Sequence, residues 1–118
     1  MENQKSGAHG ERLARAYLEA QGFICIGQNI RVGRNELDLV MRDGDYIVFV
    51  EVKARSSKAF GLPREAVDAK KQASLIRAAG GYLAKHAPDA NARFDVVEVD
   101  ILSENVTYIK NAFDAGSR

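Results

Sequence analysis

The spacing of apolar residues along the chain predicts two helices and five strands. Over residues 8–21 apolar side chains recur every three or four positions, as on the buried face of a helix, and Gly22 ends that pattern. A second helical pattern covers residues 65–86. The strand patterns are short apolar or alternating runs bounded by turn residues, and they cover residues 23–26, 36–42, 46–54, 93–101 and 106–113.

The order of these elements indicates the fold class. The order α-β-β-β-α-β-β predicts an α/β protein in which a mixed β-sheet has flanking helices. The chain has 118 residues and contains no internal repeat or linker, so we expect a single domain over residues 1–118. Residues 1–7 lack an apolar pattern and are expected to be disordered, and residues 55–65 are expected to form a loop.

Asp43-Gly44 stands between two alternating segments and predicts a tight hairpin turn. With these two residues as the loop, Glu36 lies opposite Glu51, and Asp38 lies diagonal to Glu51. Because side chains alternate along a strand, the three carboxylates then share one face of the hairpin. This prediction depends on the turn, since a different loop would change the register.

Lys53 shares the face of these carboxylates, and together they suggest a cation site. Like charges so close repel, and one carboxyl group stays protonated unless a cation intervenes. All the offered ligands are oxygens, which favours a hard divalent metal ion. The alternative is an exposed polar face on which Lys53 neutralises a neighbouring acid.

Two polar residues on the predicted helices support the same prediction of a cation site. Glu11 lies at the border of the apolar arc of the first helix and Gln72 near the middle of the inward arc of the second. Each has a structural alternative. Glu11 is a favourable acid in a first helical turn, and Gln72 could bond to a loop carbonyl.

Positive charge is concentrated in one part of a nearly neutral chain. The formal net charge is +1, but residues 53–77 contain seven basic and only two acidic residues. This distribution suits a phosphate-binding surface, and the alternative is a solvated helix face. The candidate nucleic-acid contacts are Arg31, Arg34, Arg55, Lys58, Lys70 and Lys71.

Composition excludes several other classes of protein. No run approaches the roughly 20 apolar residues of a membrane span, so no membrane partner is expected. Cys25 is the single cysteine and cannot form an internal disulfide, which fits a cytoplasmic protein. Cys25, His9 and His86 lack the spacing of zinc ligands.

Four segments carry a family resemblance. They are GERLARAYLEAQGF, NELDLVMRDGDYIVFVEVKAR, FGLPREAVDAKKQASLIRAAGGYL and RFDVVEV. Together they resemble the uncharacterised bacterial YraN family, which is similar to the restriction-endonuclease superfamily. The motif of that superfamily, PD-(D/E)XK, is an acid followed by (Asp/Glu)-X-Lys, and archaeal Holliday-junction resolvases are similar to it in pattern. Asn35 replaces the glycine that usually precedes the first acid, and Asn tolerates the same left-handed backbone.

The resemblance implies a restriction-endonuclease-like core and a metal-dependent endonuclease that hydrolyses DNA phosphodiesters, with branched or structured DNA as a candidate substrate. The catalytic residues it implies are Asp38, Glu51, Lys53, Glu11 and Gln72. The implied metal is Mg²⁺ or Mn²⁺, held by Asp38, Glu51, Glu11 and the Val52 carbonyl. By analogy the protein would act as a homodimer. A nucleic-acid-binding module of the same fold without turnover stays open as an alternative.

Overall fold

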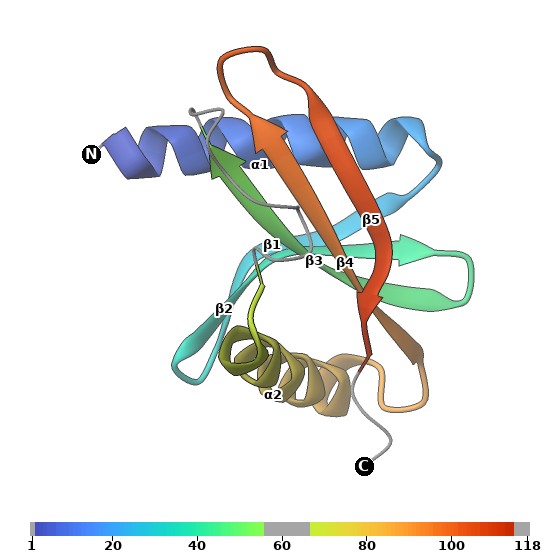
Figure 1. The fold of residues 1–118 in the computed structure, drawn as a ribbon. Coiled ribbons are helices and arrows are strands. Elements are labelled where there is room, and N and C mark those ends of the chain that lie inside the picture. The colour runs from blue at the N-terminus through green and yellow to red at the C-terminus, as the bar shows by residue number, and fades with distance from the viewer. Residues whose placement is uncertain (1, 56–66, 115–118) are drawn as a thin grey trace.

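The computed structural model describes residues 2–55 and 67–114, which form one five-stranded sheet and two helices (Figure 1). The elements in chain order are α1 (Glu2–Ala20), β1 (Ile24–Val32), β2 (Asn35–Asp43), β3 (Tyr46–Arg55), α2 (Ala69–His86), β4 (Asn91–Asp100) and β5 (Val106–Phe113). The predicted fold class and element order are therefore confirmed.

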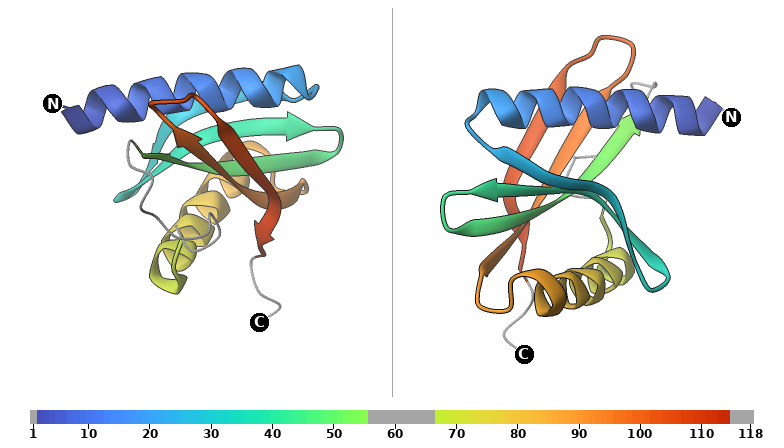
Figure 2. Two further views of the ribbon diagram at one scale, coloured as in Figure 1. Left: turned by 45° about the horizontal axis from the view of Figure 1, so that its top comes forward. Right: turned by 180° about the vertical axis from the view of Figure 1, so that it is seen from behind.

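The sheet is mixed, and its strands lie in the order β1-β2-β3-β4-β5. The only parallel pair is β3 with β4, and all other neighbours in this described sheet are antiparallel. A parallel pair needs a crossover connection, and α2 lies in that connection. The helices cover opposite faces of the sheet (Figure 2).

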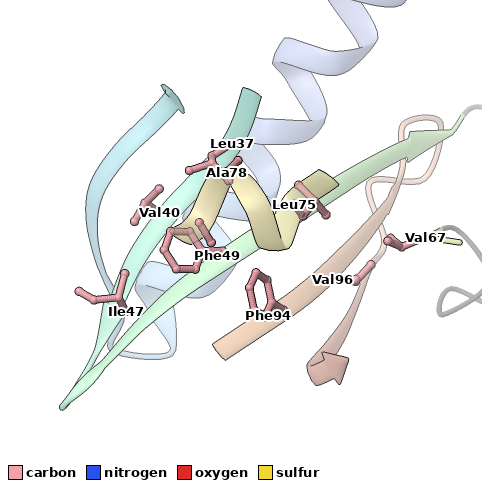
Figure 3. Close-up of a cluster of buried hydrophobic side chains, with 10 residues drawn as sticks. Leu37, Val40, Ile47, Phe49, Val67, Leu75, Ala78, Phe94 and Val96 are labelled. Atoms are coloured by element: carbon pink, nitrogen blue, oxygen red, sulfur yellow. The ribbon is translucent and has the colours of Figure 1, made fainter. Parts of the chain in front are cut away.

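Each helix packs over its own apolar cluster. The cluster beneath α2 is shown in Figure 3 and comprises Leu37, Val40, Ile47, Phe49, Val67, Leu75, Ala78, Ala79, Phe94 and Val96. The cluster beneath α1 comprises Ala14, Leu18, Phe23, Leu39, Met41, Val48, Val50, Val97 and Val99. Apolar residues alternate between the two clusters along β3 and β4, because both faces of these central strands are covered.

Several element boundaries differ from those predicted. α1 begins at Glu2, so it includes the residues 2–7 that were expected to be disordered. β1 continues to Val32, well beyond the predicted run at residues 23–26. α2 begins at Ala69 because the Asp68 side chain caps it, accepting a hydrogen bond from the Lys71 N–H (2.9 Å). The predicted loop at 55–65 lies, apart from Arg55, outside the described residues.

The predicted hairpin register is wrong by two residues. Asp43 pairs with Tyr46, so the two loop residues are Gly44-Asp45 instead of Asp43-Gly44. Gly44 adopts a positive φ of 60°, which glycine reaches at either central position of such a turn. Glu36 therefore does not lie opposite Glu51. The corrected register, continued past Leu39 and Val50, brings Asp38 beside Glu51.

Candidate functional site

Asp38 lies where β2 stops pairing regularly with β3. Leu37 packs beneath α2 although Leu39, two residues later, packs beneath α1, so the strict alternation of side chains is broken between them. At this break the Asp38 carboxylate replaces a backbone carbonyl as hydrogen-bond acceptor. Its Oδ2 accepts a hydrogen bond from the Val52 N–H at 2.9 Å. Asp38 is thereby held against β3, next to Glu51.

Glu51 is buried without a full set of partners. Its side chain is 6% exposed, and Lys71 Nζ lies 3.7 Å from its Oε2. Its Oε1 is buried and has no hydrogen-bond partner within the described part of the chain. A buried acceptor without a donor is costly, and either a proton shared with the Asp38 carboxyl group or an ion that completes the site would remove that cost.

The two carboxyl groups have raised pKa values. Burial, reinforced by the negative charge of Asp38, raises the pKa of Glu51 to about 8, although Lys71 and Lys53 counteract the shift. Burial also raises the pKa of Asp38, against the opposing effect of the Val52 N–H. Without a cation, the pair therefore favours a state in which it retains a proton near neutral pH.

A buried acid elsewhere in the sheet provides a contrast. Asp95 is fully buried, yet Arg93 donates to both of its oxygens, at 3.0 and 3.1 Å. The Tyr108 hydroxyl and the Asn111 N–H complete the set, at 2.5 and 2.9 Å. Asp95 thus has the complete shell of donors expected of a structural carboxylate, and Glu51 does not.

An open hollow of about 410 Å³ adjoins the carboxylate pair. Its lining includes Glu11, Asp38, Glu51 and Lys53 together with Gly7, Val52, Ala54 and Arg55. Glu11 reaches it from α1, and partial burial followed by the charge of Asp38 raises the pKa of Glu11. The structure thus brings four of the five predicted catalytic residues to one hollow.

Gln72, the fifth predicted catalytic residue, is not among the residues that line this hollow. Its side-chain Nε2 donates to the Val67 carbonyl oxygen at 3.1 Å. This contact is the structural alternative considered for Gln72 in the sequence, a bond to a loop carbonyl.

The donor set fits a hard divalent cation in character. Asp38 and Glu51 offer adjacent carboxylates, and Glu51 Oε1 accepts no hydrogen bond from the described residues. Glu11 lines the same hollow. Among the described residues, no three His, Cys, Asp or Glu side chains converge closely enough to form a complete metal site. The two adjacent carboxylates would thus bind an ion that keeps several waters, as Mg²⁺ commonly does.

The predicted basic contacts have different surroundings. Arg31, Arg34 and Lys70 are exposed, and Lys58 lies outside the described residues. Lys71 forms an ion pair with Glu51. Arg55 Nε forms an ion pair with Glu98 Oε2 at 2.7 Å.

Glu98 is a buried acid that the sequence reasoning missed. It lies on β4 directly beside Lys53 in the parallel register and is 3% exposed. The signal was present, because Glu98 is the one charged residue in the apolar run Val96–Val99 of β4. A charge in a run typical of a central strand needs a partner, and Arg55 pairs with Glu98 Oε2. Glu98 Oε1, like Glu51 Oε1, is buried and has no hydrogen-bond partner among the described residues.

The fold and the acid pair define the class of protein. A mixed sheet with a helix on each face, and an acid and Glu-X-Lys on adjacent strands at its centre, make this a restriction-endonuclease-like α/β protein. The chain belongs to the family described as Uncharacterised protein family UPF0102, whose model matches residues 10–99. The predicted YraN-like, restriction-endonuclease-like family is thereby confirmed.

Relatives in this family match nearly end to end. A UPF0102 protein of Clostridium acetobutylicum is 41% identical over 116 residues, which cover 94% of this chain and 95% of that protein. One from Legionella pneumophila subsp. pneumophila is 39% identical, covering 96% and 98% of the two chains. One from Beutenbergia cavernae is 52% identical over 97 residues, covering 82% and 79%.

The likeness to solved structures is weaker. Pyrococcus furiosus SfsA, solved in complex with Ca²⁺, is 16% identical, with a TM-score of 0.36 over 92% of this chain and 63% of that one. A likeness of this size carries no argument about the present chain. Separately, neither described helix has the length and apolar character needed to cross a membrane.

Proposed function

We propose that this protein is a metal-dependent endonuclease that hydrolyses phosphodiester bonds in DNA. The observation that carries the proposal is the adjacent Asp38–Glu51 pair, in which one Glu51 oxygen accepts no hydrogen bond from the described residues, in a hollow that Lys53 also lines. A raised pKa in an open hollow is typical of a functional carboxylate, whereas the buried Asp95 has a complete set of donors.

Different side chains have different roles in the proposed hydrolysis. Asp38, fixed by the Val52 N–H, and Glu51 would hold Mg²⁺ or Mn²⁺ with help from Glu11 and the Val52 carbonyl. When bound, such an ion lowers the pKa of a water molecule and stabilises negative charge at the phosphorus. Lys53 would donate hydrogen bonds to a non-bridging phosphate oxygen, where negative charge grows as water attacks and the ester oxygen leaves.

Lys71 has a separate role in this scheme. Its ammonium lies near Glu51 Oε2 and partly neutralises the pair while the ion is absent. The exposed half of the side chain leaves it free to turn towards the solvent when a divalent cation takes its place.

A cleavage panel tests the proposal. Labelled duplexes, single strands, flaps and four-way junctions are incubated with the protein in Mn²⁺, Mg²⁺ or EDTA. Cleavage in Mn²⁺ that is absent in EDTA, and absent with Asp38→Asn, is the expected result. Tight binding of the same DNAs without cleavage in any metal would contradict the nuclease and favour a binding module of the same fold.

A further inference from the structure

A second hollow lies between the β1–β2 turn and α2. It has a volume of about 400 Å³ and is lined by Val32, Gly33, Arg34, Asn35, Arg77 and Ala78. Two arginines from distant parts of the sequence therefore line one hollow, and the Arg77 guanidinium also donates to Ser74 Oγ at 3.4 Å. None of these described lining residues is acidic, in contrast to the carboxylate hollow around Asp38.

Close packing fixes the frame that carries the two arginines. A Cβ atom placed on Gly81 would lie 2.7 Å from Cγ1 of Val32, so α2 and the end of β1 are in direct contact there. Gly33 turns the chain with a positive φ of 61°. The backbones at Arg34 and Arg77 are thus held in a constant relation, although both side chains are exposed.

The carboxylate hollow is lined by the first half of α1 and the end of β3, and the second hollow by the β1–β2 turn and the middle of α2. In Figures 1 and 2 the start of α1, the end of β3 and the β1–β2 turn lie towards one side of the molecule. Asn35 lines one hollow and Asp38 the other, and they are three residues apart on β2. At about 3.3 Å per residue, the separation along the strand is roughly 10 Å.

This separation is short enough for one nucleic-acid backbone to reach both hollows. The phosphates of a strand follow one another closely, so a backbone with one phosphodiester in the carboxylate hollow would bring a nearby phosphate to the second hollow. Guanidinium groups bind phosphates in a bidentate fashion, and two of them around a hollow free of acids provide a strong phosphate site.

We propose that Arg34 and Arg77 form a phosphate-binding subsite that holds the DNA backbone close to the phosphodiester in the carboxylate hollow. The inference rests on the proposed nuclease function, because the second hollow would bind a DNA phosphate only if the carboxylate hollow acts on DNA. It assigns Arg77, which sequence reasoning had not singled out, and makes Arg34 part of a defined site.

The test compares two double variants with the same change in charge. Arg34→Gln with Arg77→Gln alters the subsite, and Arg42→Gln with Lys85→Gln alters exposed cations of β2 and α2 outside it. Duplex affinity is measured by fluorescence anisotropy in EDTA across a range of salt concentrations. We expect the slope of log affinity against log salt to become shallower by about 1.8 in the subsite variant, from two lost phosphate contacts, relative to the control.

A second measurement locates the contact. Single methylphosphonate linkages remove the charge of one phosphate at a time along the strand. One neutral linkage close to the cleavage position should weaken binding of the wild type and leave the subsite variant unaffected. If the protein does not cleave DNA, the reference position is defined by binding instead. It is the linkage whose neutralisation changes the affinity of the wild type and of Asp38→Asn to different extents.

The outcomes separate this inference from the proposed function. Equal slopes for the two double variants would overturn the subsite even if the wild type cuts DNA. A shallower slope in a protein that cuts nothing would support the subsite and overturn the nuclease. A wild type that binds no DNA would overturn both.

Discussion

The Asp38 carboxylate accepts a hydrogen bond from the main-chain N–H of Val52, with 2.9 Å between the oxygen and the nitrogen. A side chain of β2 thus occupies a position where an antiparallel neighbour would ordinarily offer a carbonyl. The contact holds the half-buried Asp38 beside the buried Glu51 and keeps the two acids together despite their repulsion. This local departure from regular pairing creates the candidate site.

Asp38→Asn should weaken Mn²⁺ binding strongly and leave the fold intact. The asparagine oxygen can still accept from the Val52 N–H, but the variant lacks one of the two adjacent negative charges. Calorimetric titration should show Mn²⁺ binding by the wild type and at least tenfold weaker binding by the variant. Mn²⁺ should also raise the melting temperature of the wild type only, because the ion binds the folded pair. If Mn²⁺ titrates the wild type and the variant identically, Asp38 is not a ligand of the metal ion.

Glu51→Gln should stabilise the metal-free protein at high pH. The pKa of Glu51 is raised in the folded state to about 8, so the folded protein holds a proton that the unfolded chain releases near 4.5. Stability from this group is complete below about pH 4.5 and is lost as the pH rises through about 8.

The pH dependence gives that prediction its measurement. With EDTA present, the unfolding free energy of Glu51→Gln should exceed that of the wild type at pH 9 by on the order of 2–4 kcal/mol, and by little at pH 5. Denaturant melts at the two pH values measure the difference. A constant gap between the two proteins at both values would contradict an ionised, buried Glu51.

Lys53→Ala and Lys71→Ala should affect different steps. Lys53 lines the hollow, and no carboxylate of the described residues lies within 4.0 Å of its ammonium, whereas Lys71 lies near Glu51. Lys53→Ala should lower the cleavage rate about 10²–10³-fold with an unchanged melting temperature. Lys71→Ala should raise Mn²⁺ affinity up to about fivefold, because a competing positive charge is gone.

Rate and affinity must be measured on the same preparations of the two lysine variants. Single-turnover cleavage measures the chemical step and calorimetry measures Mn²⁺ binding. If both variants lose activity only in proportion to unfolded protein, the two lysines are structural and the division of roles is wrong.

Gly80→Ala and Gly81→Ala form a matched pair on α2. A Cβ at Gly80 meets no atom within 4 Å, so alanine should stabilise the helix by about 1 kcal/mol. A Cβ at Gly81 would lie 2.7 Å from Val32, so the same substitution should push the β1–β2 hairpin away from α2. Thermal melts should therefore move in opposite directions. Equal stabilisation by both would mean that the hairpin is not packed on the helix as described.

Much of the architecture follows from local patterns in the sequence. Apolar spacing identified the helices and strands, because the faces that must be buried repeat with the period of each element. The Glu-X-Lys segment on β3 and the acid Asp38 on β2 were also recognisable, since a hairpin necessarily places adjacent strands side by side. These are consequences of short-range chain geometry.

The hairpin register was decided by the folded sheet. Either Asp43-Gly44 or Gly44-Asp45 can form a two-residue loop, because glycine can adopt a positive φ at either loop position. The two registers differ by two residues and bury the same faces of both strands, and the folded sheet adopts the second, which brings Asp38 to Glu51. The face change at Asp38 likewise depends on helices packed from both sides.

The partners of the site were decided entirely by tertiary structure. Lys71 reaches Glu51, and Arg55 reaches Glu98, only because β3 and β4 are parallel neighbours with α2 in their connection. Arg34 and Arg77 likewise share a hollow because the hairpin packs on α2. The sequence alone determined which charged residues were available. Their pairing depends on long-range packing, where distances between side chains have no fixed relation to distances along the chain.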